Sequence, residues 1–209
     1  IVDKADLETW TVEIDPRRVD EARLLFYAEQ GVNRISFGIQ DFDGDVQAEI
    51  NRFQEPELLD KLLTPRVRSA FREINFDLLI GLPKQTLMSI ERTIQEVVAL
   101  QPTQLQTMYV HYKPDVRKYM TRMVRNVPMP DFFERKMLFQ TAETGLIDSG
   151  YVKAGFESYA LPDDVLSKAM ESKQAYYNSL GTQAGVANNF FAVGSSAHGS
   201  FGPYYFQNF

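Results

Sequence analysis

The sequence lacks cysteine, and it has only two histidines and one tryptophan among 209 residues. The absence of cysteine excludes disulfide bonds and thiolate metal sites, and with no basic-then-apolar signal pattern at the start it favours a cytoplasmic protein. No apolar run approaches the roughly 18 residues of a membrane span. A basic excess is also missing, because the formal net charge is −6. This balance argues against a nucleic-acid partner, for which a basic face is expected.

An initiator methionine is missing as well, since the first residue is Ile1 and the last six residues are mostly aromatic. We therefore expect a fragment of a longer protein. What is present suits a globular chain, with 44% hydrophobic and 24% charged residues. This length is enough to bury the core of one domain or a little more.

Short apolar strands alternate with helical patterns over the first half of the chain. Strands are expected at 10–14, 35–39, 74–80 and 105–110, and helices at 15–30, 46–51, 57–71 and 89–100. Pro65 is expected to break the third helix. Such alternation predicts parallel strands joined by right-handed crossovers. Four units do not close an eight-stranded barrel, so the predicted fold class is α/β, as a partial, open β/α barrel.

The alternation of strand and helix patterns ends after Pro114. We expect a basic, methionine-rich segment at 116–127 and a linker at 126–130, followed by a long helix at 131–149 and a strand at 151–157. A polar loop is expected at 176–189 and a segment of small residues at 194–202. We therefore expect the partial barrel over residues 1–114. A mainly helical C-terminal extension is expected over residues 115–209.

Glu13 and Gln40 each follow an apolar run at the end of a predicted strand, where barrel proteins present the side chains of their sites. A carboxylate at Glu13 can accept the hydroxyls of a ribose or pair with an ammonium group. It can equally cap the next helix or form a salt bridge. The amide of Gln40 can bind a carboxylate or a ribose, or it can simply form a turn beside Asp41.

Arg52 and Asp77 are further candidates. Arg52 follows a short helix and can bind a carboxylate in a bidentate manner, although arginines at helix ends are more often solvated. Asp77 lies within the apolar strand at 74–80. A carboxylate in such a run is costly unless a donor reaches it, which makes Asp77 the least ordinary of these side chains.

The remaining candidates are the two histidines and a set of aromatic residues. His111 and His198 can form an acid–base pair, or each can be structural. Several aromatic side chains can line a flat macrocycle pocket or belong to the core; they are Tyr109, Tyr112, Phe156, Tyr159, Tyr176 and Tyr177. The turn at 81–86 lacks the glycine spacing of a phosphate loop.

Five blocks, in this order and spacing, resemble the oxygen-independent coproporphyrinogen III oxidase family of radical S-adenosylmethionine enzymes. They are 12–16, 33–42, 50–52, 75–80 and 81–86. The resemblance continues through 149–151, 160–164 and 192–197, so it covers nearly the whole chain.

The resemblance implies a set of cofactor-binding residues. Glu13, Gln40, Arg52 and Asp77 match the family positions that hold S-adenosylmethionine. Family members carry a second S-adenosylmethionine, and two of its neighbours fall at His111 and His198, which are small or apolar residues in well-known members. The resemblance assigns none of these residues a catalytic or metal-binding role.

The same resemblance implies a [4Fe–4S] cluster in the complete protein. Its three cysteine ligands are absent from this chain. Reductive cleavage of S-adenosylmethionine would give a 5′-deoxyadenosyl radical, which abstracts hydrogen from a propionate of coproporphyrinogen III. Loss of carbon dioxide then leads to protoporphyrinogen IX in haem biosynthesis. An electron donor for the cluster and a monomeric state are also implied.

Two departures from the family pattern concern the substrate. A glutamine thought to face the substrate falls at Leu180, and the segment 197–199 contains His198. The second feature leaves open an alternative, a haem chaperone or another tetrapyrrole-binding member of the superfamily. The turn at 162–164 favours the enzyme.

Overall fold

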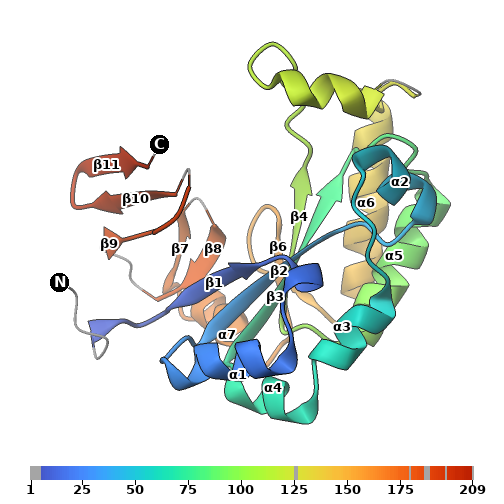
Figure 1. Ribbon diagram of the computed structural model, residues 1–209. Helices are drawn as coiled ribbons and strands as arrows, with labels where there is room; N and C mark the ends of the chain where they lie inside the picture. Colours follow the sequence, from blue (N-terminus) through green and yellow to red (C-terminus); the bar gives the residue numbers. More distant parts are fainter. Residues whose placement is uncertain (1–5, 125–126, 179, 186–188, 196, 209) are drawn as a thin grey trace.

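The computed structural model describes residues 6–124, 127–178, 180–185, 189–195 and 197–208, and a six-stranded sheet forms its centre (Figure 1). The strand order is β1-β2-β3-β4-β6-β5. The strands are β1 (Thr11–Ile14), β2 (Arg34–Gln40), β3 (Glu73–Ile80), β4 (Gln104–Tyr109), β5 (Val152–Lys153) and β6 (Ser158–Ala160). The first four are parallel, whereas β6 is antiparallel to both β4 and β5. The expected open, partial α/β barrel is therefore present as a barrel-like sheet.

Helices cover one face of this sheet. They are α1 (Glu21–Glu29), α2 (Gly44–Ile50), α3 (Pro56–Leu62), α4 (Pro65–Ala70), α5 (Leu87–Ala99) and α6 (Phe132–Asp148), with the 3₁₀ turn η2 (Pro16–Arg18) before α1. The 3₁₀ helix η3 (Lys118–Val124) lies beyond the end of β4 and contacts α2 (Figure 1). Leu24, Ile94 and Leu146 from three helices join Ile35 and Phe76 of the strands in one buried apolar core. Burial of such side chains contributes about 1.5–3 kcal/mol each and fixes the strands in register.

Capping residues set the helix boundaries. Asp20 accepts a hydrogen bond from the Arg23 amide and starts α1, so the single helix expected over 15–30 is instead the turn η2 followed by α1. The predicted break at Pro65 is confirmed, because α3 ends before Thr64 and that residue caps α4. Asp131 forms a capping box that starts α6, as expected.

The C-terminal half is more mixed than expected. Besides α6 and α7 (Val165–Glu171) it contains a hairpin, β7 (Ala175–Asn178) and β8 (Gly181–Ala184), and a small sheet of β9 (Asn189–Phe190), β10 (His198–Phe201) and β11 (Tyr204–Gln207). The expectation of a mainly helical extension was thus only partly right. The segment expected to be a polar loop contains the hairpin, and the strand expected over 151–157 is only β5. Residues 125–126 of the linker region and 186–188 and 196 of the later segments lie outside the described residues.

The large sheet continues across the expected domain boundary at 114/115. Strand β6 pairs with β4, and α6 packs on α5 and against β3 and β4. The division into 1–114 and 115–209 stays a prediction. No helix within the described ranges is long and apolar enough to cross a membrane.

Candidate functional site

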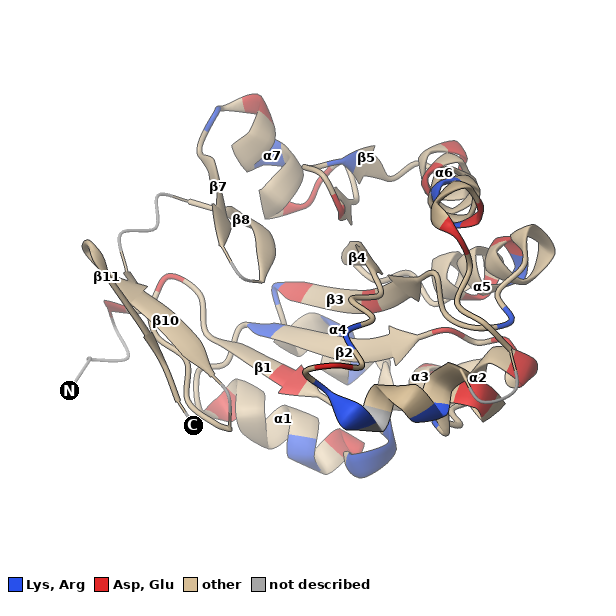
Figure 2. Cartoon of the chain, turned by 90° about the horizontal axis from the view of Figure 1, so that it is seen from above, with Lys and Arg blue, Asp and Glu red and all other residues tan. Residues whose placement is uncertain are grey.

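The two faces of the sheet differ because side chains alternate along each strand. In β2, Ile35 and Phe37 point into the core beneath the helices, whereas Arg34 and Ser36 point to the opposite, inner face. The same alternation puts polar side chains of β1, β3 and β4 on the inner face; these are Glu13, Glu73, Asn75, Asp77, Gln104 and Gln106. Figure 2 shows charged residues of the large sheet between the helices and the part formed by α7 and the β7–β8 hairpin.

Glu13 and Asp77 meet on the inner face around Ser36. Glu13 is opposite Ser36 in the β1–β2 ladder. The Ser36 hydroxyl donates to Asp77 Oδ2 at 2.9 Å, and the Asn75 amide donates to Asp77 Oδ1 at 2.7 Å and to Ser36 Oγ at 2.9 Å. We call Glu13, Ser36, Asn75 and Asp77 the upper cluster. It is a pair of carboxylates supported by hydroxyl and amide groups.

The upper cluster favours bound protons. Loss of hydration and the neighbouring Asp77 carboxylate raise the pKa of Glu13 to about 7, while Arg34 and Ser36 oppose the shift. Loss of hydration also raises the pKa of Asp77, against the hydrogen bonds from Ser36 and Asn75. The Glu13 side chain is nevertheless exposed, so water screens part of the repulsion. A cation placed here would relieve the repulsion between the two carboxylates.

Gln40 and Arg52 lie side by side next to Gly38. A Cβ added to Gly38 would lie 2.8 Å from Gln40 Nε2 and 3.4 Å from Arg52 Nη2, so only glycine leaves both side chains where they are. Arg52 Nη2 donates to the Gly38 carbonyl at 2.6 Å, and Nη1 lies 3.5 Å from Asp15 Oδ2. Gln40 adopts φ of 70° at a β-bulge that ends the pairing with β3.

This pair adjoins the upper cluster, since Gly38 is opposite Asp77 in the β2–β3 ladder. Gln40 Oε1 and Arg52 Nε are buried and have no partner within the described part of the chain. Buried polar atoms without partners are uncommon, and one cause is a missing ligand. The four candidates Glu13, Gln40, Arg52 and Asp77 therefore share one region of the inner face.

Two buried residues hold the loop that follows Gln40. Asp41 accepts hydrogen bonds from Gln85 Nε2 at 2.7 Å and from the Thr93 hydroxyl at 2.8 Å. Gln85 Oε1 accepts from the amides of Gly81 and Leu82. The turns after β2 and β3 are thus tied to each other and to α5.

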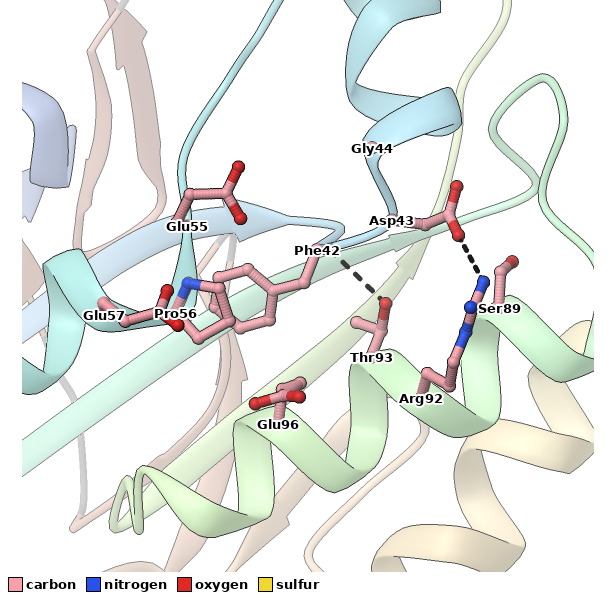
Figure 3. A pocket seen from close by; sticks show the side chains of 10 residues that line it. All are labelled: Phe42, Asp43, Gly44, Glu55, Pro56, Glu57, Ser89, Arg92, Thr93 and Glu96. Carbon is pink, nitrogen blue, oxygen red and sulfur yellow. Dashed lines mark hydrogen bonds and ion pairs between the residues drawn. The ribbon is translucent and has the colours of Figure 1, made fainter.

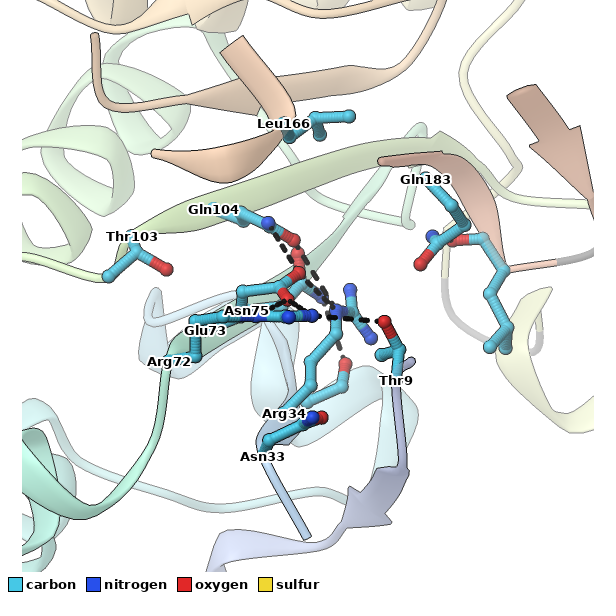
Figure 4. Close-up of polar contacts among 12 residues, drawn as sticks. Thr9, Asn33, Arg34, Arg72, Glu73, Asn75, Thr103, Gln104, Leu166 and Gln183 are labelled. Carbon is cyan, nitrogen blue, oxygen red and sulfur yellow. Dashed lines mark hydrogen bonds and ion pairs between the residues drawn. The ribbon is translucent and has the colours of Figure 1, made fainter. Parts of the chain in front are cut away.

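A second group of charged residues lies nearer the amino ends of the strands (Figure 4). Arg34 Nε lies 3.6 Å from Glu73 Oε2, and Gln104 Nε2 donates to Glu73 Oε2 at 2.8 Å and to Asp164 Oδ1 at 2.9 Å. Arg72 binds the other Glu73 oxygen at 2.5 Å. We call Arg34, Glu73, Gln104 and Asp164 the lower cluster. Its carboxylates have cationic or amide donors, unlike the pair at Glu13 and Asp77.

The β7–β8 hairpin forms a wall over this face. Gln106 donates a hydrogen bond to the Leu180 carbonyl, and the Thr182 amide donates to Ser158 Oγ at 3.3 Å. Gly181 has φ of 92°, and a Cβ there would lie 2.5 Å from Gln106 Nε2. Gln106 is opposite Asp77 in the β3–β4 ladder. Leu180 therefore lies near the upper cluster.

The two histidines are separated. His111 is exposed and follows β4, whereas His198 is half-buried in β10, with its ring 5.9 Å from that of Tyr205. No contact between them, or between either one and the upper cluster, occurs in the described ranges. The structure therefore gives no support to an acid–base pair, and their part in a second cofactor site stays a prediction.

A separate groove of about 300 Å³ opens between α3 and α5, on the helical side of the sheet (Figure 3). Acidic side chains of Glu55, Glu57 and Glu96 surround it, and Arg92 is paired with Asp43 at 2.7 Å. None of the four candidates lines it.

Ser36, Asn75 and Asp41 are site residues that the sequence reasoning missed. In β2, Arg34, Ser36 and Gly38 alternate with the three apolar residues Ile35, Phe37 and Ile39. That alternation is the available signal for a polar inner face.

The residues present do not fit an iron–sulfur cluster. The sequence has no cysteine, and no group of three or more histidine, aspartate or glutamate side chains in the described part could hold a metal ion. They do fit a polar organic ligand with cationic and hydroxyl groups. Carboxylates lie there together with an amide oxygen and a guanidinium Nε that have no partner among the residues that the structure describes.

Comparison with known proteins identifies relatives over nearly the whole chain, although no family model matches. An oxygen-independent coproporphyrinogen III oxidase of Pseudomonas aeruginosa is 35% identical over 203 residues, which are 97% of this chain and 44% of that protein. The corresponding protein of Escherichia coli K12 is 31% identical over 204 residues, covering 98% and 44%.

A solved structure agrees with these matches. Coproporphyrinogen III oxidase from Escherichia coli, described as a radical SAM enzyme, superposes with a TM-score of 0.86 at 30% identity and covers 96% of this chain and 46% of that one. The chain thus spans less than half the length of the relatives it matches. On this sequence and structural similarity, the chain is homologous to the oxygen-independent coproporphyrinogen III oxidases of the radical S-adenosylmethionine family.

Proposed function

We propose that this chain forms the S-adenosylmethionine-binding part of a radical enzyme that decarboxylates coproporphyrinogen III to protoporphyrinogen IX. The observation that carries the proposal is the grouping of Glu13, Gln40, Arg52 and Asp77 on one region of the inner face, in a chain homologous to such enzymes. When bound, S-adenosylmethionine supplies the radical chemistry of this family. The chain's own contribution is to bind and orient it.

Each side chain has a distinct part in this binding. Glu13 is exposed and can accept the ribose hydroxyls or pair with the ammonium group, while Asp77 supplies a second negative charge from β3. Among the described residues, Gln40 Oε1 has no donor and Arg52 Nε has no acceptor, so each can bind a ligand. Arg52 keeps its charge, although loss of hydration lowers its pKa. Asp41 and Gln85 act indirectly, by holding the loop after Gln40.

The cluster of the complete enzymes is a different matter. This sequence has no cysteine, so its residues supply no thiolate ligand for the cluster. These residues bind S-adenosylmethionine, and the reaction needs a cluster held by other residues. His111 and His198 stay proposed neighbours of a second S-adenosylmethionine.

Isothermal titration calorimetry of the 209-residue chain tests the binding function. We expect S-adenosylmethionine to bind. Asp77→Ala should weaken binding about tenfold or more, because it removes one of the two negative charges that face the cationic groups of the ligand, and a charged contact of this kind contributes about 1.5–3 kcal/mol. Glu91→Gln, an exposed residue on α5, is the matched control and should leave affinity unchanged. Equal affinity of Asp77→Ala and the unaltered chain would contradict the assignment.

Binding of coproporphyrin III, followed by quenching of its fluorescence, tests the substrate class. We expect binding that Leu180→Asp weakens, since this residue lies on the turn held over the inner face by Gln106. Binding that is insensitive to this change would place the tetrapyrrole elsewhere.

A haem chaperone is a second candidate, favoured by His198 beside Tyr205 in an aromatic-rich sheet. Titration with haem distinguishes it from the enzyme. A Soret shift that His198→Ala abolishes would favour the chaperone, whereas haem binding unaffected by this change would remove the observation on which this alternative rests.

A further inference from the structure

A β-bulge interrupts the β2–β3 ladder just before the proposed ligand-binding residue Gln40. Gly38 is opposite Asp77 and Gln40 is opposite Leu78, so Ile39 is the extra residue of the bulge. A bulge disrupts the ladder locally, and carbonyl groups that are buried there need other hydrogen-bond donors. The side chains that donate to the carbonyls of Gly38 and Ile39 therefore determine the conformation at the end of β2.

The side-chain amide of Gln54 donates to both carbonyls. Gln54 Nε2 donates to the Ile39 carbonyl and, at 3.4 Å, to the Gly38 carbonyl. Arg52 Nη2 donates to the same Gly38 carbonyl at 2.6 Å, and the Asp41 amide donates to the Ile39 carbonyl at 2.9 Å. Each carbonyl thus has a donor of its own, and Gln54 joins the two.

Gln54 is itself held in place, because both of its backbone polar groups pair with one buried side chain of α2. The Gln54 amide donates to Gln47 Oε1 at 3.1 Å. Gln47 Nε2 donates to the Gln54 carbonyl at 2.6 Å and to the Asp41 carbonyl at 3.0 Å. Gln47 is 1% exposed and Gln54 is 3% exposed. Gln54 is therefore anchored before any ligand binds, which is the condition for a residue that orients another.

Gln40 adopts a conformation that needs such support. Its φ of 70° lies in the left-handed region, which residues other than glycine adopt only where the surrounding structure determines it. In this conformation Gln40 Nε2 lies over Gly38, 2.8 Å from the position of an added Cβ, and Arg52 Nη2 lies 3.4 Å from the same position. A different backbone conformation at Gln40 would separate its side chain from that of Arg52.

We propose that Gln54 is a positioning residue for S-adenosylmethionine, because its amide fixes the bulge at Gly38 and Ile39 in the form that places Gln40 beside Arg52. This inference rests on the proposed function of Gln40 and Arg52. Gln54 acts through Gln40 and not by its own contact with the ligand. Its Oε1 has no partner in the described part of the chain, so a direct contact is the alternative that the test must exclude.

The position of Gln40 is tested without ligand by nuclear magnetic resonance of the full chain. The nuclear Overhauser contact between the Gln40 side-chain amide and the Gly38 α hydrogens should be lost in Gln54→Met, which keeps an unbranched side chain but has no donor. Gln95→Met, at an exposed glutamine on α5, is the matched control and should keep the contact. A contact that survives in Gln54→Met would overturn the proposal.

The Gln54→Met variant should fold, since Arg52 still donates to the Gly38 carbonyl and Asp41 to the Ile39 carbonyl. Cooperative unfolding in urea checks this expectation. Gln54→Asn, which keeps an amide but is one methylene shorter, is the second variant. It should lose the same Overhauser contact, and retention of the contact would equally count against the proposal.

Calorimetric titration with S-adenosylmethionine tests the consequence for binding. If Gln54→Met leaves the binding form populated about one tenth of the time, affinity falls about tenfold. Gln40→Ala removes the side chain through which Gln54 acts, so Gln54→Met should cost less in that background than in the unaltered chain. Unchanged affinity of Gln54→Met would overturn the proposal. The same fold loss in both backgrounds would also overturn it, because a direct contact or a general loss of structure would give that result.

The proposed function and this inference fail in different ways. If S-adenosylmethionine does not bind to the unaltered chain, the proposed function fails, whereas the Overhauser contact still decides whether Gln54 positions Gln40. If it binds and the substitutions at Gln40 and Gln54 act independently, the proposed function stands and this inference falls.

Discussion

The upper and lower clusters lie on the same face of the same sheet, yet the hydrogen-bond donors and cations around their carboxylates differ. Glu73 in the lower cluster is almost fully buried and receives Arg34, Arg72 and Gln104. Glu13 and Asp77 in the upper cluster have hydroxyl and amide donors, with Arg34 acting only from a distance. A carboxylate that is paired with a guanidinium group already has its charge compensated within the protein. A pair without one retains capacity to bind a cation.

This difference suggests that the two ends of the strands have different roles. The end of the sheet near Arg34 and Glu73 ties the sheet to α7 through Asp164, whose side chain also caps that helix. Within the described chain, buried polar atoms without a partner occur at both ends: Arg34 Nη1 in the lower cluster, and Gln40 Oε1, Arg52 Nε and Asn75 Oδ1 at the other end. What distinguishes the lower end is its guanidinium–carboxylate pairing, whereas the side chains that we propose bind a ligand lie at the other end.

The largest effect is expected from breaking the lower cluster. Glu73→Gln would leave the Arg34 guanidinium, only 1% exposed, without its buried counter-ion. Removal of one partner from a buried pair costs about 3–5 kcal/mol, so we expect a loss of this size in the free energy of unfolding, measured by urea denaturation. Glu57→Gln is the exposed control. A loss below about 1 kcal/mol, the value of a surface pair, would mean that the Arg34–Glu73 pair does not stabilise the lower cluster as a buried pair does.

A smaller effect is expected at Asn75 in the upper cluster. Asn75→Ala removes both amide donors from Ser36 and Asp77, which costs about 1–3 kcal/mol when a buried group is left unsatisfied. Urea denaturation measures the loss, with the exposed Gln95→Ala as control. We also expect weaker S-adenosylmethionine binding by this variant. If stability is unchanged, Asn75 does not support the upper cluster.

Much of the sheet could be predicted because periodicity in the first half of the chain is strong. Strands β1 to β4 alternate with helices whose caps are visible in the sequence, such as Thr86 before α5 and Asp131 before α6. The β7–β8 hairpin could not be predicted in this way. Its strands are short and polar, and its position depends on Gln106 and Ser158, which are distant in the sequence.

The site was predictable only in part, for a related reason. Asp77 stood out as a charge within an apolar strand, and Glu13 as a polar strand end. Ser36 is small and its neighbours are apolar, so nothing local marks it as the link between two carboxylates on strands that do not pair with each other. Its position follows from strand order, which sequence patterns leave open.

The smallest effect, a gain in stability where the other variants lose it, is expected at Glu13. The folded chain raises the pKa of Glu13 from 4.5 to about 7, so it binds more protons than the unfolded chain between these values. The free energy of unfolding must therefore fall as pH rises through this window and stay reduced above it. Glu13→Gln cannot ionise, so we expect this variant to be more stable than the unaltered chain at pH 8.

Urea denaturation at pH 8 and at pH 4 measures this difference, and Glu91→Gln controls for the loss of one surface charge. The gain should be modest, because solvent screens the exposed Glu13 side chain. It should nearly vanish at pH 4, where the carboxyl group is mostly protonated in both states. A variant that is less stable at pH 8 would mean that ionised Glu13 has a stabilising partner. The two clusters would then be alike. A gain confined to high pH, together with weaker S-adenosylmethionine binding, would mean that the fold tolerates an unfavourable charge at Glu13 because the cofactor uses it.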